Sequence, residues 1–186
     1  MNRPESIKDQ IREAFVHATY PGDDCLRASN QGDEPYLLAE EFRGKTDWRL
    51  LDARFIDQAP DGFGSALSFF SKEAFRSYIP AYLIADIDEA LMQSDPVFHL
   101  RHGLDDKTKD RLVNPRLYGE QTWLQLKRQQ LAVFDQQEAS AIVAYLRYIL
   151  ESDRLVDFEA RSVREALDNY WLARAGRVAA ANQRRG

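Results

Sequence analysis

The chain has 186 residues, of which 44% are hydrophobic and 30% are charged, and its net charge is −5. This length fits one domain with a substantial core, and the composition is typical of a soluble globular protein. A dense basic patch, an apolar run of about 20 residues and paired cysteines are all missing, which argues against a nucleic-acid binder, a membrane span and a disulfide framework.

Cellular location follows from the same features. The one cysteine, Cys25, is typical of a reducing compartment. The N-terminal stretch carries no apolar signal region, so the sequence predicts a cytoplasmic protein.

The first third of the chain predicts three short helices. The first has an apolar face formed by Ile7, Ile11, Ala14, Phe15 and Ala18, and it should stop near Tyr20, before Pro21 and Gly22. A second helix is predicted over residues 34–43, after Asp33 as N-cap. A third should start after Thr46 or Asp47 and continue to Phe55, and residues 59–65 should form a loop.

The central segment, residues 71–91, predicts the helix around which the others pack. Ser71 is a suitable N-cap. Apolar side chains then recur every four residues: Phe75, Ile79, Leu83, Ile87 and Leu91. Pro80 interrupts this pattern, because it offers no N–H to the carbonyl of Arg76. Two geometries follow: one kinked helix, or two helices with Pro80 in the first turn of the second.

Beyond residue 94 the prediction is less regular at first. Residues 94–119 contain two prolines and two glycines and should form only short turns. A brief helix is predicted over 123–131, and a long one from Gln136, because Asp135 and Glu138 form a capping box. A last helix should carry residues 163–171.

The fold class predicted is all-α: one compact helical domain, 1–186, with about six helices around a proline-kinked central helix and a C-terminal helical extension at 151–186.

Five features carry a resemblance to known proteins: AF at 14–15, YPGD at 20–23, Phe42 with Gly44 and Trp48, SFFSKEAFRSYIPAYL at 68–83 and FDQQEASAIVAYLRYI at 134–149. Together they resemble a family of small uncharacterised bacterial proteins that is known only as a domain of unknown function. The resemblance covers about residues 7–150. It implies a helical fold and a bacterial origin, and it assigns no chemistry.

Two clusters are candidate sites. Asp95, His99 and His102 have the spacing of ligands on one helix face, and imidazole with carboxylate suits zinc or iron. Pro96 and Gly103 disfavour a regular helix there, so two surface histidines explain the pattern better.

The second candidate is a binding site at the proline, formed by Tyr78, Pro80, Tyr82 and the carbonyls that Pro80 leaves without a donor. A purely structural kink is the favoured alternative. The sequence indicates no catalytic constellation and no cofactor.

The charge is distributed unevenly. Residues 1–100 hold 18 acidic against 10 basic side chains, a net charge of −8, whereas residues 101–186 hold 12 against 15, a net charge of +3. An acidic surface accelerates encounters with a basic partner, although such surfaces also arise for solubility alone. The leading hypothesis is therefore a non-catalytic protein–protein interaction module with a basic protein partner, in one version an immunity-type inhibitor. The alternative is a small enzyme, in one version metal-dependent, with its site near Pro80 or near His99 and His102.

Overall fold

The structure is a computed structural model, and it describes residues 3–176 apart from the side chain of Leu117. Within these residues the regular structure is helical, with two isolated β-bridges and no strand. The prediction of an all-α fold is confirmed. None of the described helices is both long and apolar enough to cross a membrane.

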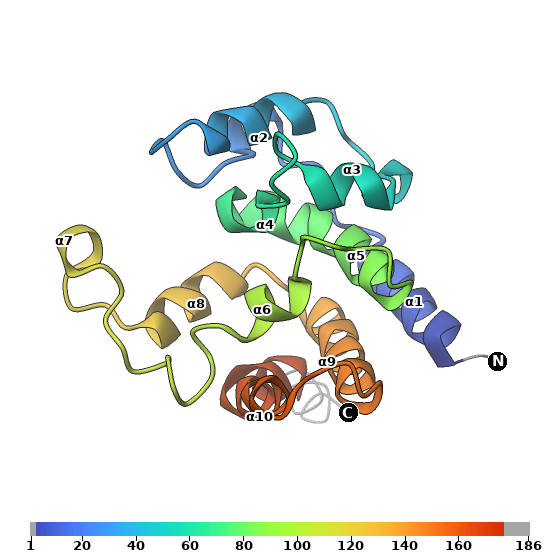
Figure 1. The fold of residues 1–186 in the computed structure, drawn as a ribbon, viewed down its shortest axis with the longest axis vertical. Helices are drawn as coiled ribbons and strands as arrows, with labels where there is room; N and C mark the ends of the chain where they lie inside the picture. Colours follow the sequence, from blue (N-terminus) through green and yellow to red (C-terminus); the bar gives the residue numbers. More distant parts are fainter. Residues whose placement is uncertain (1–2, 177–186) are drawn as a thin grey trace, which may run out of the picture. The chain divides into compact units, whose positions relative to one another are not determined.

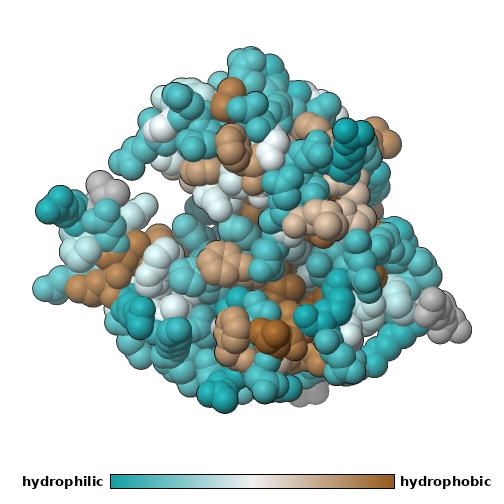
Figure 2. Space-filling view, in the orientation of Figure 1, coloured by the Kyte–Doolittle hydropathy of each residue, from teal (hydrophilic) through white to brown (hydrophobic). Residues whose placement is uncertain are grey.

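The helices group into two compact units, residues 1–99 (unit 1) and residues 100–186 (unit 2). Unit 1 carries the net charge of −8 counted for residues 1–100, because residue 100 is an uncharged leucine. The division into domains, including an extension at 151–186, stays a prediction. The face drawn in Figure 2 is mainly hydrophilic, with hydrophobic residues scattered over it.

Unit 1 is built on the helix α5, Lys72–Ile87, which continues unbroken through Pro80 (Figure 1). The structure therefore selects one helix rather than two. The hydroxyl of Ser71 accepts the N–H of Ala74 at 3.0 Å and caps it as predicted. Ile79 and Leu83 are fully buried, while Phe75 is half-buried.

The other elements of unit 1 surround α5. They are α1 (Arg3–Ala14), η1 (Asp23–Cys25), α2 (Glu34–Phe42), η2 (Trp48–Leu50), α3 (Ala53–Gln58) and α4 (Ala66–Phe69). Among them α1, η2 and α3 pack directly on α5. The rings of Phe42 and Phe70 lie 4.8 Å and 5.2 Å from that of Tyr78 and form the aromatic centre of the core.

Three sequence-based expectations for helices in unit 1 were wrong in detail. The first helix, α1, ends at Ala14 and does not continue to near Tyr20. The helix predicted from Thr46 or Asp47 through Phe55 is two elements, because Asp47 and Asp52 each cap a separate one. Asp47 accepts the N–H of Arg49 at 3.0 Å, and Asp52 accepts that of Phe55 at 2.8 Å. The predicted N-cap of α2, Asp33, makes no side-chain capping bond.

Residues 94–119 contain more helix than predicted. A six-residue helix, α6 (Pro96–Arg101), lies at the boundary of the units, and α7 (Pro115–Tyr118) follows in unit 2. Both begin with a proline, preceded by a side chain that accepts a backbone N–H: Asp95 from Phe98, and Asn114 from Arg116. Proline at the first helical position starts a helix as readily as it ends one.

Unit 2 is organised around α9, Gln136–Glu151, against which the C-terminal elements pack (Figure 1). The predicted capping box is present, with bonds of 2.9 Å in both directions between Asp135 and Glu138. The other elements are α8 (Trp123–Leu131), α10 (Asp157–Ala166), the π-helical turn η3 (Leu167–Trp171) and α11 (Leu172–Gly176).

Candidate functional site

Among the described residues of unit 1, two of the three most exposed large apolar side chains lie on two loops that meet beside the buried Asp57. Phe63, 68% exposed, is on residues 60–64, and Met92, 89% exposed, is on residues 89–93. We call these ten residues the two-loop surface. Apolar side chains that are exposed together on one surface can mark an interaction site, whereas single exposed ones are ordinary.

Asp57, at the end of α3, holds the second loop. Its Oδ1 accepts the backbone N–H groups of Met92, Gln93 and Ser94 at 3.0, 2.9 and 2.9 Å. Burial alone would raise the pKa of Asp57, but these three N–H groups outweigh it and hold the pKa below its ordinary value. The carboxylate is therefore charged at neutral pH and fixes the backbone beside Met92.

The first loop is tied to the same point. The hydroxyl of Ser94 donates to the carbonyl of Gly64 at 3.2 Å, and the N–H of Gly64 donates to the carbonyl of Gln58, also at 3.2 Å. Gly64 has φ +64°, and a Cβ there would lie 2.5 Å from the Asp57 carbonyl and 2.7 Å from the Cβ of Gln93. Only glycine fits, so the two loops are in direct contact and are held in a fixed arrangement.

Carboxylates accompany the two apolar side chains. Asp61 and Glu89 are exposed, one on each loop, and both adopt left-handed backbone conformations with φ 50° and 55°. The N–H of Asp61 donates to Glu41 Oε1 at 2.7 Å, which brings a third acid beside the loop. The surface thus combines apolar anchors with negative charge, an arrangement suited to binding a basic partner.

The predicted binding residues Tyr78, Pro80 and Tyr82 all belong to α5 and are all buried. The Tyr78 hydroxyl donates to the carbonyl of Lys45 at 2.9 Å. The Tyr82 hydroxyl is buried and has no hydrogen-bond partner among the described residues. Burial raises the pKa of both hydroxyls. A ligand would have to enter the core to reach them, and a site there stays a prediction.

Removing the hydroxyl should change the free energy of unfolding differently at the two tyrosines. Tyr78→Phe should lower the free energy of unfolding by about 1 kcal/mol, because it leaves the Lys45 carbonyl without its donor. Tyr82→Phe should leave stability unchanged or raise it, because it removes a buried polar atom that has no partner. Urea denaturation of both variants measures the difference, and equal losses would contradict the assignment.

The predicted metal ligands have other contacts. Asp95 accepts the N–H of Phe98 at 2.8 Å, His99 lies 5.3 Å from the ring of Phe98, and His102 packs edge-on against Trp123 at 4.8 Å. Burial, and after it the charge of Lys127, lowers the pKa of His102. Between residues 3 and 176 no three His, Cys, Asp or Glu side chains are grouped to hold a metal ion. A metal site at Asp95, His99 and His102 stays a prediction.

Sequence reasoning identified residues 59–65 as a loop but missed the two-loop surface. The only local signal was Phe63 within a glycine-rich segment, and Asp57 looked like one more surface acid. Nothing in the sequence indicates that Asp57 meets a backbone segment 35 to 37 residues further on.

Comparison with protein families gives one result: the model of a family of unknown function, DUF6714, matches residues 3–175. Neither the curated proteins nor the solved structures contain a match to the chain. The family match runs past residue 150, where the resemblance was expected to end, and includes α10 and η3.

Proposed function

The chain belongs to DUF6714, a family of unknown function, and from this premise we propose that it is a non-catalytic interaction module whose unit 1 binds a basic protein. The two-loop surface carries the proposal, because it presents two rigidly held apolar anchors among carboxylates. We place this activity in the cytoplasm of a bacterium, in keeping with the single cysteine.

Charge supports the choice of partner. Unit 1 has a net charge of −8, and the acids on or beside the two loops are Asp61, Glu89 and Glu41. Long-range attraction of this sign raises the association rate of a positively charged protein and weakens as salt is added. Neither nucleic acid nor an anionic membrane would be attracted to such a surface.

The apolar anchors supply the short-range part of the affinity. Large side chains at the centre of an interface account for most of its binding free energy. Phe63 and Met92 are mounted on loops that Asp57 and Ser94 fix in place, so little backbone freedom is lost on binding. The narrower form of the proposal is an immunity-type inhibitor, which neutralises a basic toxin by covering its active surface.

Affinity capture with the wild-type chain, followed by binding measurements on variants of Phe63 and Met92, tests the proposal. The immobilised wild-type chain should retain a protein rich in lysine and arginine from its source cells at about 50 mM salt and release it at about 500 mM. The double variant Phe63→Ala/Met92→Ala should bind this protein at least roughly tenfold more weakly, as measured by calorimetry with the purified partner.

Leu50→Ala is the matched control. Leu50 is 82% exposed and belongs to unit 1 but lies on η2, outside the two-loop surface. Its loss should leave the affinity within about twofold, as expected for a residue outside the interface. Recovery of no protein at either salt would overturn the interaction role. A partner that binds the double variant and the wild type equally would overturn the assignment to this surface.

A further inference from the structure

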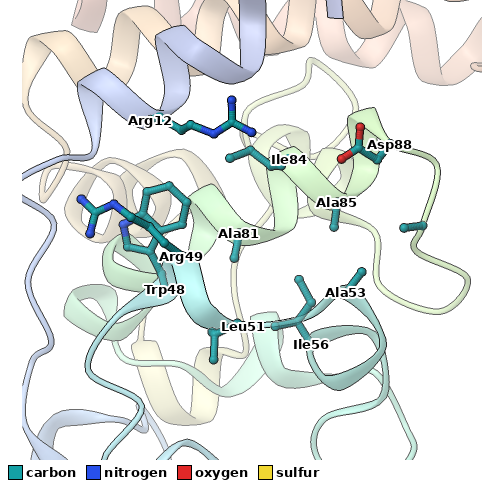
Figure 3. Close-up of a pocket in the computed structure, with 11 residues that line it drawn as sticks. Arg12, Trp48, Arg49, Leu51, Ala53, Ile56, Ala81, Ile84, Ala85 and Asp88 are labelled. Atoms are coloured by element: carbon teal, nitrogen blue, oxygen red, sulfur yellow. The ribbon is translucent and has the colours of Figure 1, made fainter. Parts of the chain in front are cut away.

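A hollow of about 330 Å³ lies along α5, and its charged lining residues are already compensated (Figure 3). The ion pairs, at 2.7, 3.0 and 2.7 Å, are Arg12 with Asp9, Arg49 with Asp47 and Asp88 with Lys8. In Figure 3 the guanidinium groups of Arg12 and Arg49 point apart. This hollow therefore offers no uncompensated charge for a partner to recognise.

Uncompensated positive charge is concentrated in one segment of unit 2. Residues 107–128 hold six basic and two acidic side chains, a net charge of +4. The rest of the unit, residues 101–106 and 129–186, holds nine basic and ten acidic side chains, a net charge of −1. We call residues 107–128 the basic segment, because the whole positive excess of unit 2 comes from it.

Part of the basic segment projects as a loop that is closed at its base. Leu112 and Thr122 form an antiparallel bridge, and the N–H of Val113 donates to the carbonyl of Gln121 at 2.9 Å. The helix α7 within this loop lies away from α8, α9 and α10 (Figure 1). Because hydrogen bonds hold the base of the loop, little backbone freedom is lost when it binds a partner.

The projecting loop and its base present charge and apolar surface together. Lys107, Arg111 and Arg116 are exposed, and within the described part of the chain they form no ion pair. Leu112 and Tyr118 are 50% and 47% exposed. Cations beside exposed apolar side chains suit a partner that combines carboxylates with apolar side chains of its own.

The two-loop surface of unit 1 has these matching properties. Asp61 and Glu89 are exposed and, as far as residues 3–176 show, are likewise in no ion pair. They share their loops with the exposed Phe63 and Met92. The two surfaces have charges of opposite sign, so every copy of the chain carries both halves of a complementary contact.

We propose that the two-loop surface also binds the basic segment of a second copy of this chain, so that self-association competes with the basic protein for one surface. The inference rests on the proposed function, because it uses the same surface. Since the two halves of the contact differ, each copy can bind one neighbour through its basic segment and another through its loops.

Sedimentation velocity of the purified full chain tests the proposal. As the protein concentration rises, the chain should associate at about 50 mM salt and dissociate again at about 500 mM. Arg111→Gln/Arg116→Gln should raise the concentration needed for association at least roughly tenfold, because two cations that face carboxylates are lost.

Arg161→Gln/Arg164→Gln is the matched control. Both arginines are exposed on α10, so this variant removes the same charge from unit 2 outside the basic segment. It should shift the association by less than about twofold. A chain that stays monomeric at every concentration would overturn the proposal, also if its basic segment bound single-stranded DNA instead. Equal effects of the two double variants would overturn it as well.

Mixing two variants tests the pairing itself. Asp61→Asn/Glu89→Asn removes the loop charges, and asparagine tolerates the left-handed backbone of both residues. Neither this variant nor Arg111→Gln/Arg116→Gln should associate alone where the wild type does. Their mixture should form pairs, because one variant supplies intact loops and the other an intact basic segment. A mixture that stays monomeric would contradict the contact.

The result can be separated from that of the affinity capture, because only the purified chain is present. Capture of a basic protein without self-association would overturn this inference and leave the proposed function standing. Self-association without capture would support the inference and overturn the external partner. Where both occur, Arg111→Gln/Arg116→Gln should bind the captured protein more tightly than the associated wild type does, as measured by calorimetry, and equal affinities would overturn the competition.

Discussion

Replacing Asp57 by alanine should lower the free energy of unfolding by about 3 kcal/mol, the largest effect we expect for a single polar side chain in unit 1. The substitution removes one acceptor from three backbone N–H groups, of which that of Ser94 lies in a buried residue. Each donor then loses a charge-assisted bond, and the buried one keeps the cost of desolvation. Urea denaturation followed by circular dichroism measures the loss.

The pH dependence gives an independent test of the same residue. The folded pKa of Asp57 lies below its unfolded value of about 3.9, so its contribution is fully present above that value and is lost as pH falls through the folded pKa. Stability of the wild type should therefore fall more steeply than that of Asp57→Asn as the pH decreases from about 5 to about 2. Parallel curves would contradict the role assigned to the carboxylate.

Asp52→Ala is the appropriate control for Asp57→Ala. Asp52 stands at the other end of α3 and accepts a single N–H, from the exposed first turn at Phe55. Its loss should cost about 1 kcal/mol, as for an ordinary N-cap. Because Asp57 fixes the two-loop surface, its substitution should also weaken binding of the basic partner, whereas that of Asp52 should not. Equal effects of the two substitutions would indicate that Asp57 is only a helix-end residue.

Trp171→Ala should destabilise unit 2 by about 3–5 kcal/mol, the range for removing a large aromatic side chain from a core. Trp171 is fully buried and contacts the rings of Phe134 and Tyr170 at 5.9 Å and 5.1 Å. Its indole N–H also donates to the carbonyl of Leu100 at 2.8 Å. The variant should therefore lose both packing and a buried hydrogen bond, which thermal and urea denaturation would detect.

Trp171→Phe separates these two contributions. Phenylalanine keeps most of the packing but leaves the Leu100 carbonyl without its donor, so we expect a loss of about 1–2 kcal/mol. A loss as large as that of the alanine variant would mean that the hydrogen bond, and not the packing, dominates. No loss in either variant would contradict the place of Trp171 in the core.

The π-helical turn explains why this tryptophan reaches the start of unit 2. Leu167–Trp171 interrupts the regular helix between α10 and α11 and changes the direction in which the following side chains point. Asn169 and Trp171 from this turn bond the carbonyls of Leu104 and Leu100, both at 2.8 Å. The sequence predicts a helix over 163–171 but contains no signal for the extra residue in the turn.

Helix caps and helix starts could be predicted from the sequence without a structure. The N-cap at Ser71 and the capping box at Asp135 are hydrogen bonds between residues three apart in the sequence. The start of α8 near residue 123 was predicted from the spacing of apolar residues within that helix. The acidic half of the chain is likewise a property of composition. These features depend only on residues close together in the sequence, so the sequence is sufficient to predict them.

The tertiary structure alone decided the sites. Asp57 is one acid among 18 in its half of the chain, and it becomes the organising residue only when α3 meets residues 92–94. Ala81 and Ala85 look like ordinary helix formers, and they line a hollow only because α3 and η2 pack opposite them. Helix formation depends on residues a turn apart, whereas a pocket or a buried acceptor depends on which distant surfaces meet, and that is a property of the packed chain as a whole.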